Sequence, residues 1–143
     1  MATYRIDDDK FIELADTLGP EAVGGYIYTT EGCMKGFVNC MTLGLTDRLG
    51  YELQSTVEGP TVTHNRLIVY GLALFILHYG WDLKDGDLIE NLPSVTATCR
   101  IFDTTFKGKR VLRVILPDTQ GHTEPDEIAF PFSLQYGGPQ LYE

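Results

Sequence analysis

Residues 67–77 read LIVYGLALFIL, and this run decides the fold that we expect. Nearly every position is apolar, and a helix that is apolar on every face is buried. The run is too short to cross a bilayer, which takes about 20 residues. Thr61 or Thr63 would cap the start of the helix, and Gly80 would close it. We therefore expect either a central core helix or a helix whose second face is covered by another subunit.

Strand-like segments lie on both sides of this helix in the sequence. They are residues 26–30, 37–45, 51–57, 95–102 and 110–116, with the last two arranged as an antiparallel hairpin. A final strand is expected at 128–134, where Pro131 would restrict it to a sheet edge. The sequence thus predicts an α+β fold, in which a twisted, mainly antiparallel sheet packs on one long apolar helix.

A short amphipathic helix is expected near the N-terminus, because Asp7, Asp8 and Asp9 precede apolar residues at helical spacing. The length of 143 residues suits one domain with its own core. We expect a single domain over 1–143, with 135–143 as a flexible tail or an inter-subunit arm. The all-round apolar helix and the many tyrosines also predict a homo-oligomer, most simply a dimer.

The charge balance excludes several partners. The formal net charge is -9, from 20 acidic against 11 basic residues spread along the chain. A broad negative field repels nucleic acids and anionic membranes, so we expect neither as a general partner.

The three cysteines, Cys33, Cys40 and Cys99, lack the spacing of a disulfide framework or a zinc site. Reduced thiols and an N-terminus without an apolar core predict a cytoplasmic protein.

Two places could hold a ligand. The strand-like run at 110–116 stops at Pro117, after which Asp118, Gly121 and His122 form a rim of the kind where folds keep their chemistry. The start of the apolar helix brings Thr63, His64 and Arg66 to a helix N-terminus, which attracts anions. An ordinary helix cap and an ordinary turn would explain the same residues. We name Thr63, His64, Arg66, Asp118 and His122 as ligand-binding candidates.

Three separated pieces of the chain together suggest a family. They are Thr42-Leu43-Gly44-Leu45 with Gly50-Tyr51-Glu52-Leu53, Gly80-Trp81 with Gly86-Asp87, and Leu116-Pro117-Asp118 with Gly121. In this order they resemble an uncharacterised bacterial and phage family, catalogued as domain of unknown function forty-two sixty-two. The resemblance covers roughly Tyr26 to Glu127 and implies a small α+β domain with no established activity.

The chain departs from the pattern of that family at two places. The family tends to carry a His-Pro-Glu step where this chain has Gly50-Tyr51-Glu52, so an imidazole is missing. It also tends to carry Gly-x-x-Pro followed by an aromatic residue, where this chain has Gly121-His122-Thr123-Glu124-Pro125. Any chemistry that the family performs with those groups would not transfer to this chain.

Signatures of catalysis are scarce. The sequence holds no G-x-S-x-G elbow and no phosphate-binding glycine loop. We therefore expect a non-enzymatic binding protein, which sequesters a small nucleotide-like ligand or blocks a protein partner in a phage or bacterial anti-defence or immunity role. No catalytic residue, metal or cofactor is assigned. The alternative is a metal-assisted hydrolase that uses Asp118, His122 and Glu124.

Overall fold

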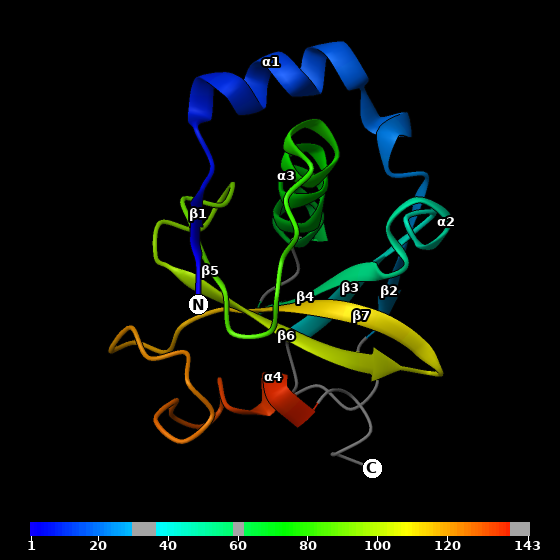
Figure 1. Ribbon diagram of the computed structural model, residues 1–143. Coiled ribbons are helices and arrows are strands. Elements are labelled where there is room, and N and C mark those ends of the chain that lie inside the picture. The colour runs from blue at the N-terminus through cyan, green and yellow to red at the C-terminus, as the bar shows by residue number, and fades with distance from the viewer. Residues whose placement is uncertain (30–36, 59–61, 138–143) are drawn as a thin grey trace.

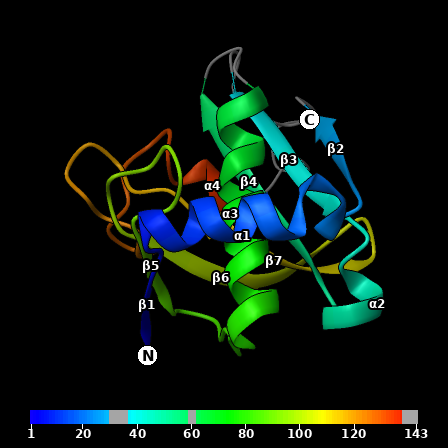
Figure 2. The ribbon, with the colours of Figure 1, turned by 90° about the horizontal axis from the view of Figure 1, so that it is seen from above.

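The computed structural model describes residues 1–29, 37–58 and 62–137. Its elements form layers, which Figure 1 shows edge-on. Helix α1 (Asp8–Leu18) lies above helix α3 (Val62–Tyr79), and α3 lies on one face of the sheet. The short helix α4 (Leu134–Gly137) lies against the opposite face. Seen from above, α1 crosses over α3 (Figure 2).

A single mixed sheet forms the centre of the molecule. In the described part of the chain its strands run β1-β5-β6-β7-β4-β3-β2 across the sheet. The pairs β1/β5 and β4/β7 are parallel, and the other neighbours are antiparallel. The strands are β1 (Thr3–Arg5), β2 (Gly25–Thr29), β3 (Phe37–Leu43), β4 (Glu52–Glu58), β5 (Leu88–Glu90), β6 (Cys99–Phe106) and β7 (Lys109–Ile115).

This arrangement corrects the predicted fold class. The mainly antiparallel sheet on one long apolar helix is wrong, because the sheet is mixed and several helices accompany it. Besides α1, α3 and α4 these are α2 (Thr46–Leu49) and the 3-10 turn η1 (Pro20–Ala22). Helix α3 returns the chain across the sheet between β4 and the strands that follow, and such crossovers allow parallel pairing. Residues 128–133 are irregular or in turns and lead into α4, which begins at Leu134, so the predicted strand at 128–134 is not formed.

Helix α3 is enclosed within this chain. Its middle is buried between the sheet and α1, whereas His64, Arg66, His78 and Tyr79 near its ends are exposed. Gly71 of this helix packs closely against the loop that follows β5, because an added Cβ atom would lie 2.6 Å from Pro93 Cγ. The covering of α3 therefore does not require a second subunit, and the dimer stays a prediction. None of the helices in the described residues is both long and apolar enough to span a membrane.

A buried carboxylate joins α2 to the beginning of β4. Glu52 accepts hydrogen bonds from Thr42 Oγ1 (2.8 Å), Leu45 N (3.1 Å) and Thr46 N (2.8 Å), and from the Thr46 hydroxyl. Desolvation opposes ionisation of this group, but these hydrogen bonds outweigh it and lower the pKa of Glu52. Glu52 thus serves as an ionised acceptor that holds the 42–46 segment in place.

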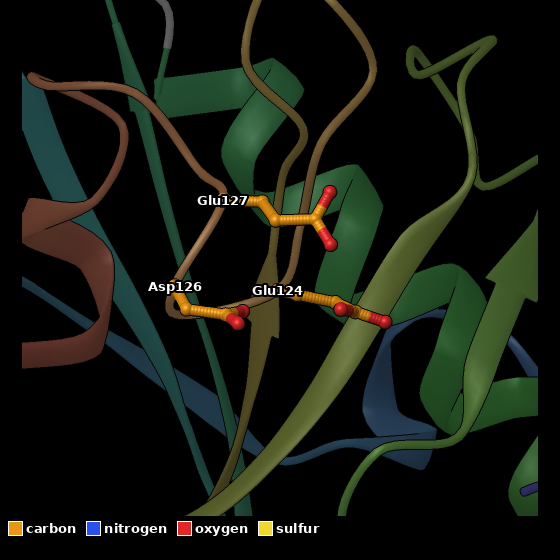
Figure 3. Close-up of side chains that lie close together, drawn as sticks. All are labelled: Glu124, Asp126 and Glu127. Atoms are coloured by element: carbon orange, nitrogen blue, oxygen red, sulfur yellow. The ribbon is translucent and has the colours of Figure 1, made fainter.

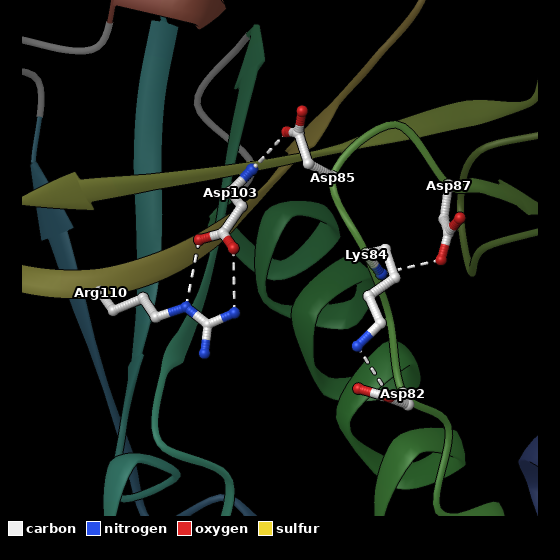
Figure 4. A network of polar contacts seen from close by, with 6 residues as sticks. All are labelled: Asp82, Lys84, Asp85, Asp87, Asp103 and Arg110. Carbon is white, nitrogen blue, oxygen red and sulfur yellow. Dashed lines mark hydrogen bonds and ion pairs between the residues drawn. The ribbon is translucent and has the colours of Figure 1, made fainter. Parts of the chain in front are cut away.

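The exposed Arg110 of the β6–β7 hairpin is matched by an acid. Arg110 donates two hydrogen bonds to the Asp103 carboxylate, at 3.1 and 2.9 Å, as Figure 4 shows. The Asp103 backbone N–H donates in turn to Asp85, and Lys84 forms an ion pair with Asp82 at 2.8 Å. Arg110 is therefore already paired with a carboxylate.

Candidate anion-binding site on the second face of the sheet

A row of side chains crosses the sheet on the face opposite α3. Strand pairing places Phe102 beside Arg113, Arg113 beside Gln54, and Gln54 beside Met41. Side chains alternate along each strand. On β7, Leu112 and Val114 therefore pack toward α3, and this row points to the other face. The residues of the row thus come from four strands, β6, β7, β4 and β3, and the segment that carries α4 lies against the same face of the sheet.

Arg113 is fixed at the centre of this row. Its side chain is only 2% exposed. Its Nε–H donates to Gln54 Oε1 at 2.7 Å, and Nη1 donates to the carbonyl oxygens of Gln135 and Tyr136 at 3.0 and 3.1 Å. The guanidinium carbon lies 5.8 Å from the centre of the Phe102 ring. The group is therefore held in one position by contacts on three sides.

Two buried nitrogen atoms of this site have no hydrogen-bond acceptor among the described residues. They are Arg113 Nη2 and Gln54 Nε2. The orientation of the Gln54 amide is determined, because only its oxygen can accept from Arg113 Nε–H. Buried donors without an acceptor are rare and costly. The two nitrogens belong to the two groups that the 2.7 Å hydrogen bond joins, so one small acceptor would serve both.

Arg113 also carries a buried positive charge. No acidic side chain in the described part of the chain forms an ion pair with it. Burial in this dry environment lowers the pKa of Arg113 to about 10, and the group is still cationic at neutral pH. A buried cation is normally paired with an anion. The chemistry of this donor set thus suits an anion.

The segment that covers the site is held by Gln135. This buried side chain accepts from Leu116 N at 2.8 Å and donates to Leu116 O at 2.8 Å, as a neighbouring strand would. The ring of Tyr136 contacts that of Phe102 edge-on at 5.0 Å, and its hydroxyl donates to Thr123 O. Residues 135–137 of the predicted tail are therefore anchored, and residues 138–143 lie outside the described part.

The ligand candidates at the start of α3 lie elsewhere in the fold. His64 and Arg66 are exposed, and the side chain of Thr63 lies outside the described residues. Arg66 lies near Tyr26 of β2, where burial raises the pKa of the phenol to about 12 and the arginine charge acts against this rise. These candidates remain a prediction.

Asp118 shapes its turn from inside. Its carboxylate accepts three backbone hydrogen bonds, from Gln120 N and His122 N at 2.9 Å and from Ala129 N at 2.8 Å. Desolvation would raise the pKa of Asp118, but these donors lower it overall. His122 is half exposed, and its Nδ1 lies 3.6 Å from Asp118 Oδ2. The structure therefore brings these two predicted residues together in a turn, with the Asp118 oxygens already occupied.

An acidic cluster lies on the surface beside this turn. In the described residues, Glu124, Asp126 and Glu127 are the group whose ligand atoms all lie within 4.8 Å of one another, and Figure 3 shows the three side chains. All three are exposed, and Glu124 lies 3.8 Å from Arg100. The set proposed for hydrolysis, which combined Glu124 with Asp118 and His122, is not brought together as one metal-binding group.

A hollow of about 530 Å³ lies where the ends of α1 and α3 approach α2. It is lined by Leu18, Glu21, Ala22, Arg48, Leu77 and His78. Four of these six side chains are exposed, so a ligand here would stay largely in water. The hollow offers less specific chemistry than Arg113 and Gln54 do.

The sequence did contain a signal for Arg113. A single charge stands inside the otherwise apolar run Val111–Ile115, at a position that alternation assigns to a buried face. The nearby basic residues Lys107, Lys109 and Arg110 are exposed, so Arg113 differs from them in its burial. Gln54 carried no such signal, since its role depends on the strand that pairs with β4.

The comparisons with known proteins add no relative to this description. No protein-family model, no curated protein and no solved structure matches the chain.

Proposed function

We propose that this protein is a non-enzymatic binding protein that takes up a small anionic group at Arg113 and Gln54. The observation that carries the proposal is the pair of buried N–H donors, Arg113 Nη2 and Gln54 Nε2, beside a cation with no ion-pair partner in the described residues. An anion would satisfy both donors and compensate the charge. Sequestration in an anti-defence or immunity role stays a prediction.

Binding has more support than catalysis. The described thiols are poor nucleophiles, because burial raises the pKa of Cys40 and of Cys99 to about 12 and keeps both protonated at neutral pH. Cys33 lies outside the described residues. For the alternative of metal-assisted hydrolysis, the Asp118 carboxylate already accepts three backbone hydrogen bonds, and it does not form one metal-binding group with His122 and Glu124. The geometry thus favours a site that holds an anion without transforming it.

A panel of anions tests the proposal. Acetate, phosphate, sulfate and adenosine monophosphate are added at equal ionic strength, and the thermal midpoint of the full chain is measured. An anion at 100 times its Kd stabilises by about 2.7 kcal/mol, which raises Tm by roughly 5–10 °C for a chain of this size. We expect at least one anion to do so and to be recovered chemically unchanged.

Two arginine variants make the test specific. In Arg113→Met the guanidinium is lost, so the anion should no longer raise Tm. Arg110→Met removes an exposed arginine that is paired with Asp103, and should respond like the wild type. If Arg113→Met does not fold, Gln54→Glu supplies an internal carboxylate and should abolish the response in a folded protein. An equal response in all variants, or none in the wild type, would disprove the proposed function.

A further inference from the structure

We infer that the anionic group is a singly charged carboxylate on an apolar body, and not a phosphate. This inference rests on the proposed function and names the ligand class of the same site. It follows from the number of donors, the charge and the surroundings of Arg113. Each of these favours a planar group with two oxygen atoms over a tetrahedral group with more.

The number of available donors is small. Of the guanidinium nitrogens, Nε donates to Gln54 and Nη1 to the carbonyls of Gln135 and Tyr136. Among the described residues, only Nη2 and Gln54 Nε2 lack an acceptor. A carboxylate presents two acceptor oxygens in one plane, which suits two planar donor groups. A phosphate presents at least three oxygens, and the described residues offer no further unpaired buried donor for the extra ones.

The charge also matches a monoanion. Arg113 contributes one positive charge, and no acid or second cation among the described residues forms an ion pair within this site. A carboxylate would bring the buried charge to zero. A phosphate dianion would leave one negative charge buried without a partner, which is strongly unfavourable. The overall net charge of -9 opposes a dianion further.

Apolar side chains lie on both sides of Arg113 and Gln54 in the row. Phe102 lies on one side of Arg113 in the row. On the other side, Met41 belongs to a small buried apolar cluster with Phe106 and Val111. This cluster is separate from the main core under α3. A hydrocarbon or aromatic body attached to the carboxylate would contact these groups, so an aromatic carboxylate such as benzoate should bind more tightly than acetate.

The test compares anions by nuclear magnetic resonance on the uniformly ¹⁵N-labelled full chain. The observed signal is the Gln54 side-chain amide, which is identified by its absence from the spectrum of Gln54→Glu. Sodium acetate, sodium benzoate, inorganic phosphate and adenosine monophosphate are titrated at pH 7 and constant ionic strength. We expect saturable shifts of this amide with benzoate and acetate, with a Kd for benzoate at least tenfold below that for phosphate.

The outcomes separate the two proposals. A lower Kd for phosphate or the nucleotide than for benzoate would overturn the carboxylate inference, while the anion-binding function would stand. Absence of any saturable shift with all four anions would overturn both. Arg110→Met should give the wild-type titration, because its side chain lies outside the site. If Arg113→Met gave the same titration as the wild type, both proposals would also be overturned, because the guanidinium would then contribute nothing.

Discussion

Arg113 on β7 donates its Nε–H to Gln54 Oε1 on the neighbouring parallel strand β4, over a distance of 2.7 Å. An amide oxygen thus stands where a buried arginine would normally meet a carboxylate. The other nitrogen of each group has no acceptor in the described part of the chain. One isosteric substitution can therefore alter the charge of the site with little change in its shape.

Gln54→Glu should stabilise the protein. The new carboxylate would still accept from Nε, would compensate the charge of Arg113, and would remove one buried donor that has no acceptor. We expect the free energy of unfolding to rise by about 2 kcal/mol and Tm by roughly 4–8 °C, measured by urea and thermal unfolding. The exposed Gln120→Glu serves as control and should change stability by less than about 0.5 kcal/mol. If Gln54→Glu were no more stable than the wild type, this would contradict the conclusion that Arg113 has no acidic partner among the described residues.

Glu52→Gln should weaken the fold and change its response to acid. The amide would place two N–H groups among donors such as Leu45 N and Thr46 N, which costs about 2 kcal/mol at pH 7. Because the pKa of Glu52 is lowered in the folded state, its contribution is present above the unfolded pKa of about 4.3. That contribution is lost as the pH falls through the folded pKa.

The acid limb of the unfolding curve measures this difference. Urea unfolding from pH 7 to pH 3 should show a smaller loss of stability in Glu52→Gln than in the wild type. The exposed Glu13→Gln should follow the wild type. Parallel curves for Glu52→Gln and the wild type would show that the pKa of Glu52 is not lowered in the folded protein.

Gly71→Ala should destabilise the protein although alanine favours helices. The added Cβ would lie 2.6 Å from Pro93 Cγ, so α3 and the 93 loop would have to separate. We expect a net loss of about 2 kcal/mol, because overpacking outweighs the helix-propensity gain of about 1 kcal/mol. In a Pro93→Ala background the loss should shrink, which a double-mutant cycle in urea measures. An equal loss in both backgrounds would show that this contact is not the cause.

Gln135→Glu should loosen the segment that covers Arg113. A carboxylate oxygen would replace the nitrogen that donates to Leu116 O and Phe132 O, at 2.8 and 2.9 Å. We expect a loss of about 2–3 kcal/mol and faster hydrogen exchange at the Leu116 amide. Gln120→Glu, exposed on the surface, is the matched control. Unchanged protection of Leu116 would exclude this anchoring role for Gln135.

Strand positions could be predicted where local patterning was long enough. The runs at 26–30, 37–45 and 110–116 lie close to β2, β3 and β7, because β-forming residues continue over several positions there. The strands β1 and β5 were missed, since three residues are too few to show a period. The apolar residues of 128–134 suggested a strand that Pro131 would restrict to a sheet edge, but the chain turns there and enters α4.

The sequence by itself determined the single charged position inside the apolar run of β7, the apolar character of the α3 segment and the net charge. It could not determine strand direction, because pairing joins residues far apart, as Gln54 and Arg113 show. Only the tertiary structure decided that Arg113 is buried, since Gln135 and Tyr136 cover it from the other end of the chain. Burial matters for this arginine because removal from water makes the lack of an acidic partner among the described residues costly.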